Sequence, residues 1–269
     1  YGDHRVLHLS LRRQRQMCIR DSLRDVQEAW KTTGRPPITV RWVEVNKGDD
    51  ECPKIRSRLV AREIRTAGED SIFAPTPPLE SLRMVLSYAV TDFPDEPKKI
   101  RSPSHPDRTQ VLLIDISRAY FNAVTSEEEP SYVELPPESG APPGTCALLR
   151  RHMYGTRRAA EGWQNEYSST LRLLGFAQGA ASACVFRRKE KQLVCSVHGD
   201  DFTIAGPCRA LPPRRRPQKS RNDFEKIYQY KLRRFQNISV LQILQLRIDF
   251  QIPLLCKQSS YLFLHHLQK

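Results

Sequence analysis

The chain has 269 residues, of which 39% are hydrophobic and 27% charged, and it carries a formal net charge of +13. This composition excludes a disordered tail, because enough large apolar residues are present to form a core. It also excludes an integral membrane protein, since no stretch approaches the roughly 20 consecutive apolar residues that a spanning helix needs.

The seven cysteines are scattered along the chain and include no C-x-x-C pair. This pattern is unlike a disulfide framework or a zinc site, and it is typical of a protein kept in a reducing compartment. We therefore expect an intracellular location, either cytoplasmic or nuclear, and no membrane partner.

The positive charge comes from the two ends of the chain. Residues 1–22 carry +3 and residues 207–269 carry +10, whereas the stretch between them holds 25 basic and 25 acidic side chains. A basic excess is typical of proteins that bind nucleic acids. Two interpretations of the ends stay open: a nucleic-acid-binding tail, or artefactual sequence that includes a shifted reading frame after residue 206. The second is suggested by residues 12–22 (RRQRQMCIRDS), which resemble a translated cloning adaptor.

The first elements predicted in chain order are a β-hairpin and a helix. Residues 38–45 alternate and are rich in β-branched side chains, which is typical of a strand. A turn at 46–50 precedes a second strand-like run at 55–64, so the two runs predict a hairpin. Residues 79–90 place leucine, valine and alanine at helical spacing and predict an amphipathic helix.

The second half of the chain alternates short strands with helical segments. Residues 111–114 resemble a buried strand that ends at Asp115, and a helical turn is expected at 119–123. A helical stripe begins at Ala160 and ends before Gly175. Further strands are expected at 132–135, 185–186, 193–197 and 202–205.

The order of these elements predicts the fold class. Strands and helices interleave, and the loops between them are too short to separate independent domains. This order favours a split α/β sandwich of the α+β class over a doubly wound sheet.

Two acidic features stand out chemically. Asp115 ends an apolar strand, and the sequence His198-Gly199-Asp200-Asp201 lies between two apolar strands. Adjacent carboxylates repel each other and lose solvation, so they are rarely placed there for stability. Magnesium prefers carboxylate oxygens and would remove this conflict. The alternative is an ordinary solvated hairpin turn, with Asp115 capping a helix.

The surroundings of these acids resemble a known family. Residues 111–121 (VLLIDISRAYF) resemble the first catalytic motif of reverse transcriptases. Ordered blocks on both sides resemble the polymerases of Ty1/copia-type retrotransposons, and together they span about residues 38–206. These blocks are 41–43 (RWV), 56–62 (RSRLVAR), 73–76 (FAPT), 132–137 (YVELPP), 149–163 (LRRHMYGTRRAAEGW), 174–176 (LGF), 182–186 (SACVF) and 196–202 (SVHGDDF).

The resemblance implies a catalytic, metal-binding set of three carboxylates. Asp115 and Asp200 would be the main ligands and Asp201 would support them. The cofactor implied is a pair of Mg²⁺ ions, with Mn²⁺ as the alternative. Tyr120 would be a steric gate that leaves no room for a 2′-hydroxyl and so selects deoxynucleotides.

The resemblance also implies a nucleotide-binding set. Arg58 and Arg62 stand where the family carries basic residues toward the triphosphate, and guanidinium groups suit multiple contacts to phosphate. Gly155 and Arg157 lie in the block that contacts the incoming nucleotide and the template. The alternative for each arginine is a solvated surface position.

The domain organisation implied is a polymerase palm of ferredoxin-like topology with a fingers extension. The fingers would span 23–100 and the palm 101–206, and residues 1–22 and 207–269 match nothing in the family. The hairpin that carries Asp200 and Asp201 departs from the family at His198, where an aromatic residue is common, and at Gly199. These departures predict a looser hairpin. The partners implied are an RNA or DNA template with its primer, dNTPs, and integrase and RNase H domains of the same polyprotein.

The function implied is that of an RNA-directed DNA polymerase, a nucleotidyltransferase. Two alternatives stay open: an inactive retroelement remnant with at most non-specific nucleic-acid binding, and an RNA-dependent RNA polymerase, for which Gly-Asp-Asp is also a signature. The latter enzymes usually place an acid five residues after the first aspartate, and here that position is Tyr120.

Overall fold

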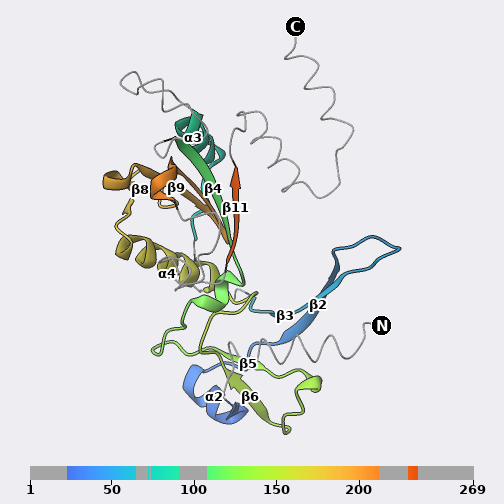
Figure 1. The fold of residues 1–269 in the computed structure, drawn as a ribbon. Coiled ribbons are helices and arrows are strands. Elements are labelled where there is room, and N and C mark those ends of the chain that lie inside the picture. Colours follow the sequence, from blue (N-terminus) through green and yellow to red (C-terminus); the bar gives the residue numbers. More distant parts are fainter. Residues whose placement is uncertain (1–22, 65–71, 73, 91–107, 212–229, 236–269) are drawn as a thin grey trace, which may run out of the picture. The chain divides into compact units, whose positions relative to one another are not determined.

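The computed structural model describes residues 23–64, 72, 74–90, 108–211 and 230–235 (Figure 1). Residues 1–22 and most of 207–269, for which the sequence leaves two interpretations open, lie outside the described residues.

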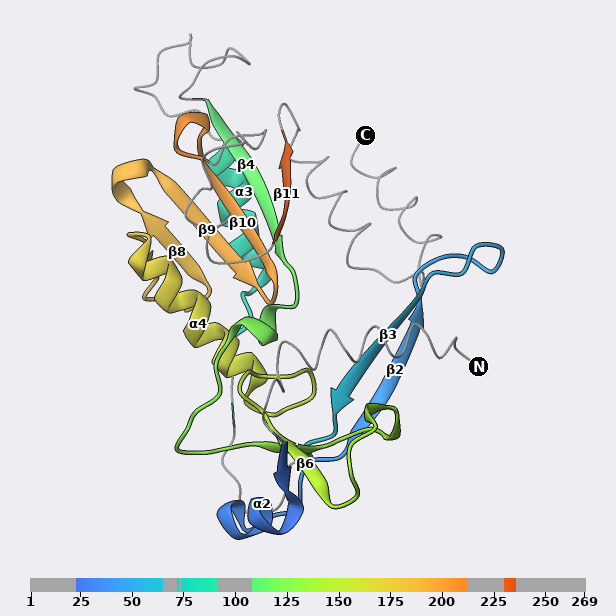
Figure 2. The same ribbon diagram turned by 60° about the horizontal axis from the view of Figure 1, so that its bottom comes forward.

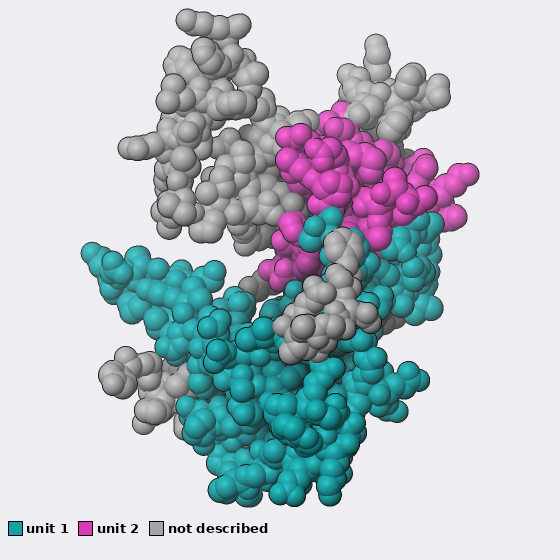
Figure 3. All heavy atoms as spheres, turned by 180° about the vertical axis from the view of Figure 1, so that it is seen from behind, with its two compact units in different colours: residues 1–76, 116–178, 223–230 teal, residues 77–115, 179–222, 231–269 magenta. Residues whose placement is uncertain are grey.

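The chain divides into two compact units, which Figure 3 shows in different colours. Each unit is assembled from separate stretches of sequence. Unit 1 consists of residues 1–76, 116–178 and 223–230, and unit 2 consists of residues 77–115, 179–222 and 231–269.

Unit 1 contains the predicted hairpin. Strand β2 (Val40–Asn46) pairs antiparallel with β3 (Ile55–Ala61) along its whole length (Figure 1). The alternation of side chains gives the hairpin two faces. One face buries Leu59 and Ala61 in the core of the unit, and the other carries Arg58 opposite Val43.

A small sheet lies beside helix α2 (Val26–Thr33) in unit 1. Its strand order is β1 (Leu23–Asp25), β6 (Thr145–Leu148), β5 (Tyr132–Glu134), all antiparallel. Only β5 was predicted. The Asp25 carboxylate accepts hydrogen bonds from two backbone N–H groups of the first helical turn, which caps α2.

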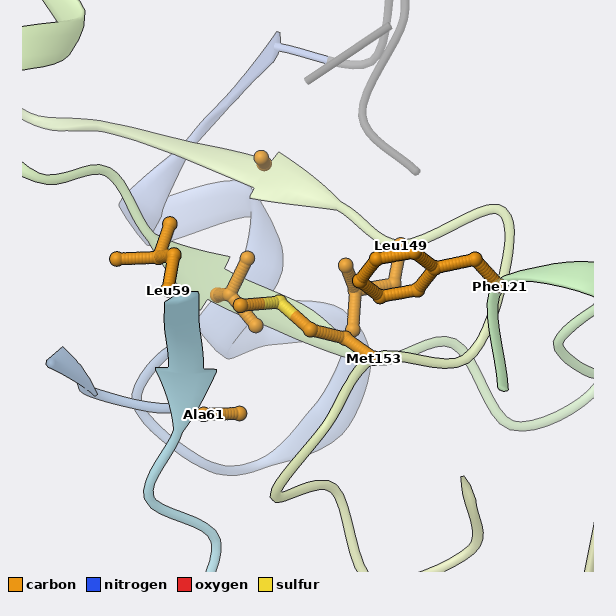
Figure 4. Close-up of a cluster of buried hydrophobic side chains, with 7 residues drawn as sticks. Leu59, Ala61, Phe121, Leu149 and Met153 are labelled. Carbon is orange, nitrogen blue, oxygen red and sulfur yellow. The ribbon is translucent and has the colours of Figure 1, made fainter. Parts of the chain in front are cut away.

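The core of unit 1 joins segments that are far apart in the sequence. Figure 4 shows Leu59, Phe121, Leu149 and Met153 gathered together, and each of them is at most 3% exposed. Ala61, Val133 and Ala147 complete this cluster. The core therefore connects the hairpin to the segments that follow Asp115 and precede α4.

Helix α4 (Ala159–Leu173) confirms the predicted helical stripe. Trp163 and Tyr167 are buried, and their rings meet edge to face with centroids 5.6 Å apart. Both aromatic residues are therefore buried side chains rather than exposed stacking surfaces. The 3-10 turn η3 (Ala119–Asn122), which also belongs to unit 1, packs against this helix.

Unit 2 is built around an antiparallel sheet (Figure 2). Strand β4 (Thr109–Ile116) pairs with β10 (Asp201–Pro207), and β10 pairs in turn with β9 (Leu193–His198). Strand β8 (Val185–Arg188) lies on the far side of β9, and β11 (Tyr230–Phe235) lies on the other side of β4. The strands expected at 111–114, 185–186, 193–197 and 202–205 are all confirmed.

Helix α3 (Leu79–Val90) covers one face of this sheet. Its buried residues Leu82, Val85 and Leu86 pack against Val111 of β4 and Ala205 of β10. The helix has the bounds that the apolar spacing predicted. Burial of this stripe fixes which face of the sheet is covered, because a shift of one residue in a strand would turn its apolar side chains outward.

The described residues form a mixed α/β fold with three α-helices and several antiparallel sheets. This agrees with the expected α+β class, in which sheets are antiparallel and helices pack on their faces. No helix among the described residues combines the length and the apolar character that crossing a membrane would require.

Candidate active site

A tight hairpin in unit 2 carries two of the predicted catalytic aspartates. His198 of β9 pairs with Asp201 of β10, so Gly199 and Asp200 form a two-residue turn. Gly199 has a positive φ of 62°, whereas Asp200 does not. A glycine with positive φ at the first central position is typical of a type II′ turn, which matches the twist of the flanking strands. The hairpin is therefore tight, where the sequence had predicted a looser one.

Asp115 lies beside this hairpin. It ends β4 and is directly opposite Asp201, which in turn is opposite His198. Directly opposed residues of antiparallel strands share one face of the sheet. Asp115, Asp201 and His198 therefore form a row across three neighbouring strands, and both aspartates are exposed.

The register of the strands places the two adjacent aspartates differently. Asp201, rather than Asp200, is paired with Asp115, and Asp200 occupies the turn. His198 was not among the residues predicted for the site. The signal was available, because a Gly-Asp turn between two strands requires His198 and Asp201 to be opposed.

The site has donors for a hard cation but no complete metal cage. Within the described part of the chain, no three His, Cys, Asp or Glu side chains are close enough to hold a metal ion together. Magnesium is commonly bound through one or two carboxylates, with waters and substrate phosphates supplying the other ligands. The opposed carboxylates of Asp115 and Asp201 fit that kind of donor set.

The predicted gate, Tyr120, lies in η3 of unit 1. Arg118 begins this turn with a positive φ of 56°. The Asn122 side chain donates to the Arg118 carbonyl at 3.3 Å, and the Arg151 guanidinium donates to the Asn122 carbonyl at 2.6 Å. The Phe121 N–H also donates to the Arg118 carbonyl, at 3.0 Å. These bonds fix the short segment that carries the tyrosine.

Tyr154 links two of the predicted nucleotide-binding residues. Its ring meets the Tyr120 ring edge to face, with centroids 5.0 Å apart, and meets Phe121 in the same way at 5.3 Å. The guanidinium carbon of Arg58 lies 5.3 Å from the centroid of the same ring. The sequence pattern does not point to Tyr154, because its partners Arg58, Tyr120 and Phe121 lie in two segments far from it along the chain.

Three predicted nucleotide-binding residues remain: Arg62, Gly155 and Arg157. They lie where the end of β3 runs beside the turn at 154–157. The Gly155 carbonyl accepts a hydrogen bond from the Glu63 N–H, and the Arg157 N–H donates to the Glu63 carboxylate at 2.7 Å. Gly155 has a positive φ of 87°. Arg62 is exposed at the end of the hairpin. All five predicted nucleotide-binding residues therefore belong to unit 1, and the three aspartates belong to unit 2.

Arg157 also lines a polar hollow of about 560 Å³ in unit 1. The lining carries both signs of charge, including Glu63, Glu129 and Arg158. Arg158 and Glu129 form an exposed ion pair at 2.7 Å. Neither Tyr120 nor Arg58 lines this hollow, so it is separate from the cluster around Tyr154.

His152, at the edge of this hollow, gives unit 1 a pH-dependent stability. Burial lowers the pKa of His152; Glu161 opposes this effect and Arg158 adds to it. The unfolded chain therefore takes up a proton before the folded one, and stability falls as the pH drops through the unfolded value of about 6.5.

We expect the free energy of unfolding to fall between pH 7.5 and pH 5.5, and to fall less for His152→Gln than for the unchanged chain. Urea unfolding at the two pH values measures this difference. Gln keeps a polar side chain of similar length but does not titrate. An equal loss in both proteins would contradict this role of His152.

Comparison with known proteins identifies the class to which this fold and these residues belong. The chain matches the reverse transcriptase (RNA-dependent DNA polymerase) family over residues 27–247 and belongs to it. The match continues beyond Gly206, where the resemblance by motif ends.

A distant relative is the retrovirus-related Pol polyprotein from transposon TNT 1-94 of Nicotiana tabacum, a copia-type protein. It is 23% identical over 189 residues, which are 66% of this chain. The matched region is only 13% of the length of that polyprotein.

Proposed function

We propose that this chain carries the RNA-directed DNA polymerase activity of a copia-type retroelement and extends a primer 3′-hydroxyl with dNTPs on a template. The observation that carries the proposal is the pairing of Asp115 with Asp201 beside a tight Gly199-Asp200 turn. Membership of the reverse transcriptase family supports it independently. The proposed fold is a palm of ferredoxin-like topology with fingers.

In this proposal Asp115, Asp200 and Asp201 hold two Mg²⁺ ions, for which Mn²⁺ could substitute. Bound ions would help to deprotonate the primer hydroxyl and stabilise the leaving pyrophosphate. The chain contributes the register of β4 and β10, which holds two carboxylates opposite each other on one face of the sheet. Preorganised donors of this kind avoid reorganisation when the reaction occurs.

The nucleotide would be bound by residues of unit 1. Tyr120 would pack under the sugar and exclude a 2′-hydroxyl, while Arg58 and Arg62 would contact the phosphates. Gly155 and Arg157 would contact the nucleotide and template. The proposed partners are an RNA or DNA template with its primer, and the integrase and RNase H domains of a longer polyprotein.

The test is primer extension on an RNA template with dNTPs and an excess of Mg²⁺. We expect extension that stops when EDTA removes the divalent ions and returns when Mg²⁺ is added in excess. Equal use of ribonucleotides and deoxynucleotides would instead support an RNA polymerase. Binding of the template without extension would indicate an inactive remnant, and this binding should weaken steeply with salt.

A further inference from the structure

We propose that Tyr154 is a positioning residue that holds the Tyr120 ring and the Arg58 guanidinium in place together. This inference rests on the proposed function, because it concerns how the same site distinguishes deoxynucleotides from ribonucleotides. It follows from three contacts of one ring: with Tyr120, with Phe121 and with Arg58.

The main chain at Tyr154 is held on both sides. Its carbonyl accepts a hydrogen bond from the Ala61 N–H of β3 at 2.8 Å. Met153, which precedes it, is 2% exposed in the core of unit 1. Gly155, which follows it, packs so closely on Ala61 that no side chain fits there. The ring of Tyr154 therefore projects from a fixed backbone.

The ring is also fixed from the side. Phe121 is 3% exposed, and its edge-to-face contact with Tyr154 connects the ring to the core. Tyr154 itself packs against that core while staying partly exposed. Edge-to-face contacts between aromatic rings are favourable beyond the area that they bury.

Tyr120 depends on this support. Its ring is only half-buried, and Tyr154 lies against it at an interplanar angle of 60°. A gate that excludes a hydroxyl by its size must resist being pushed aside, so the ring behind it contributes to selectivity. Without Tyr154, Tyr120 could turn away and admit a 2′-hydroxyl.

Arg58 depends on the same ring in a different way. Its side chain lies on the face of the hairpin opposite the buried Leu59, and the cation is placed over the Tyr154 ring. A cation held over an aromatic face loses less freedom when it later binds a phosphate. Selection of the sugar and affinity for the triphosphate are therefore coupled through one side chain.

The experiment compares Tyr154→Phe and Tyr154→Leu with the unchanged chain. Phe keeps the ring and is expected to keep both properties. Leu removes the ring, and we expect the preference for dATP over ATP to fall roughly three- to tenfold, with a rise in KM for dATP and a smaller change in kcat. Tyr167→Leu is the matched control, because it removes the edge-to-face contact with Trp163 in the same unit.

Two readouts separate this inference from the proposed function. The first is primer extension with dATP and with ATP, and the second is equilibrium binding of each nucleotide in the presence of template and primer. A lost preference in Tyr154→Leu but not in Tyr167→Leu supports the inference, even if only binding is measurable. A retained preference in a folded Tyr154→Leu protein overturns it while leaving the polymerase proposal intact. If the unchanged chain shows no preference for dATP over ATP in either assay, the inference is wrong. If the unchanged chain binds nucleotide with that preference but does not extend the primer, only the proposed activity fails.

Discussion

Replacement of Asp115 by Asn is expected to abolish most primer extension while leaving the fold intact. Asn has nearly the same size but lacks the negative charge that a divalent cation requires. We expect the rate to fall roughly 100-fold or more, which corresponds to about 2.7 kcal/mol of transition-state stabilisation. Primer extension at saturating Mg²⁺ and dNTP measures this change directly.

The same Asp115→Asn substitution should not lower the free energy of unfolding, although it lowers activity. Asp115 is exposed and directly opposite Asp201, and like charges at opposed positions of a sheet are destabilising. Asp115→Asn should therefore unfold at the same or a slightly higher urea concentration. Asp50→Asn is the matched control, since Asp50 is an exposed aspartate in the turn between β2 and β3. Activity that survives Asp115→Asn would refute the catalytic assignment.

Replacement of Gly155 by Ala is expected to destabilise unit 1 strongly. Gly155 has a φ of 87°, which residues with a Cβ rarely adopt. A Cβ at this position would also collide with the Ala61 carbonyl oxygen and lie 2.7 Å from Cγ1 of Val60. The strained backbone and the overlap together should cost more than about 2 kcal/mol of the free energy of unfolding. Urea denaturation followed by circular dichroism measures this loss.

Gly140→Ala is the matched control for this prediction. Gly140 also has a positive φ, of 64°, but a Cβ there meets no atom within 4 Å. Its replacement should therefore cost only the backbone strain, about 1 kcal/mol. Equal losses in the two variants would show that the contact of Gly155 with β3 does not contribute.

The elements that the sequence predicted well are those with a strong apolar period. Helix α3 and strand β3 are examples, because their buried side chains repeat at the spacing of the element itself. Strands β1 and β6 were missed. They are 3 and 4 residues long, and they pair with each other.

The candidate site shows the same limit. The aspartates stood out because acids between apolar strands are conspicuous, whereas the role expected of Tyr120 came from the resemblance to reverse transcriptases. It could not identify Tyr154, whose partners Tyr120 and Arg58 come from distant parts of the chain. The positive φ of Arg118 was equally invisible, since glycine rather than arginine is the usual residue for that conformation.

The division into two units made from alternating stretches has a consequence for how the protein is synthesised. The chain passes between the units at residues 76–77, 115–116, 178–179, 222–223 and 230–231. During translation neither unit can close when its first stretch leaves the ribosome, because its later stretches have not yet been made. A fragment that ends near residue 100 would hold the β2–β3 hairpin without Leu149 and Met153, against which Leu59 packs. Such a fragment should expose apolar surface and aggregate, so the two units cannot be produced separately by simple truncation.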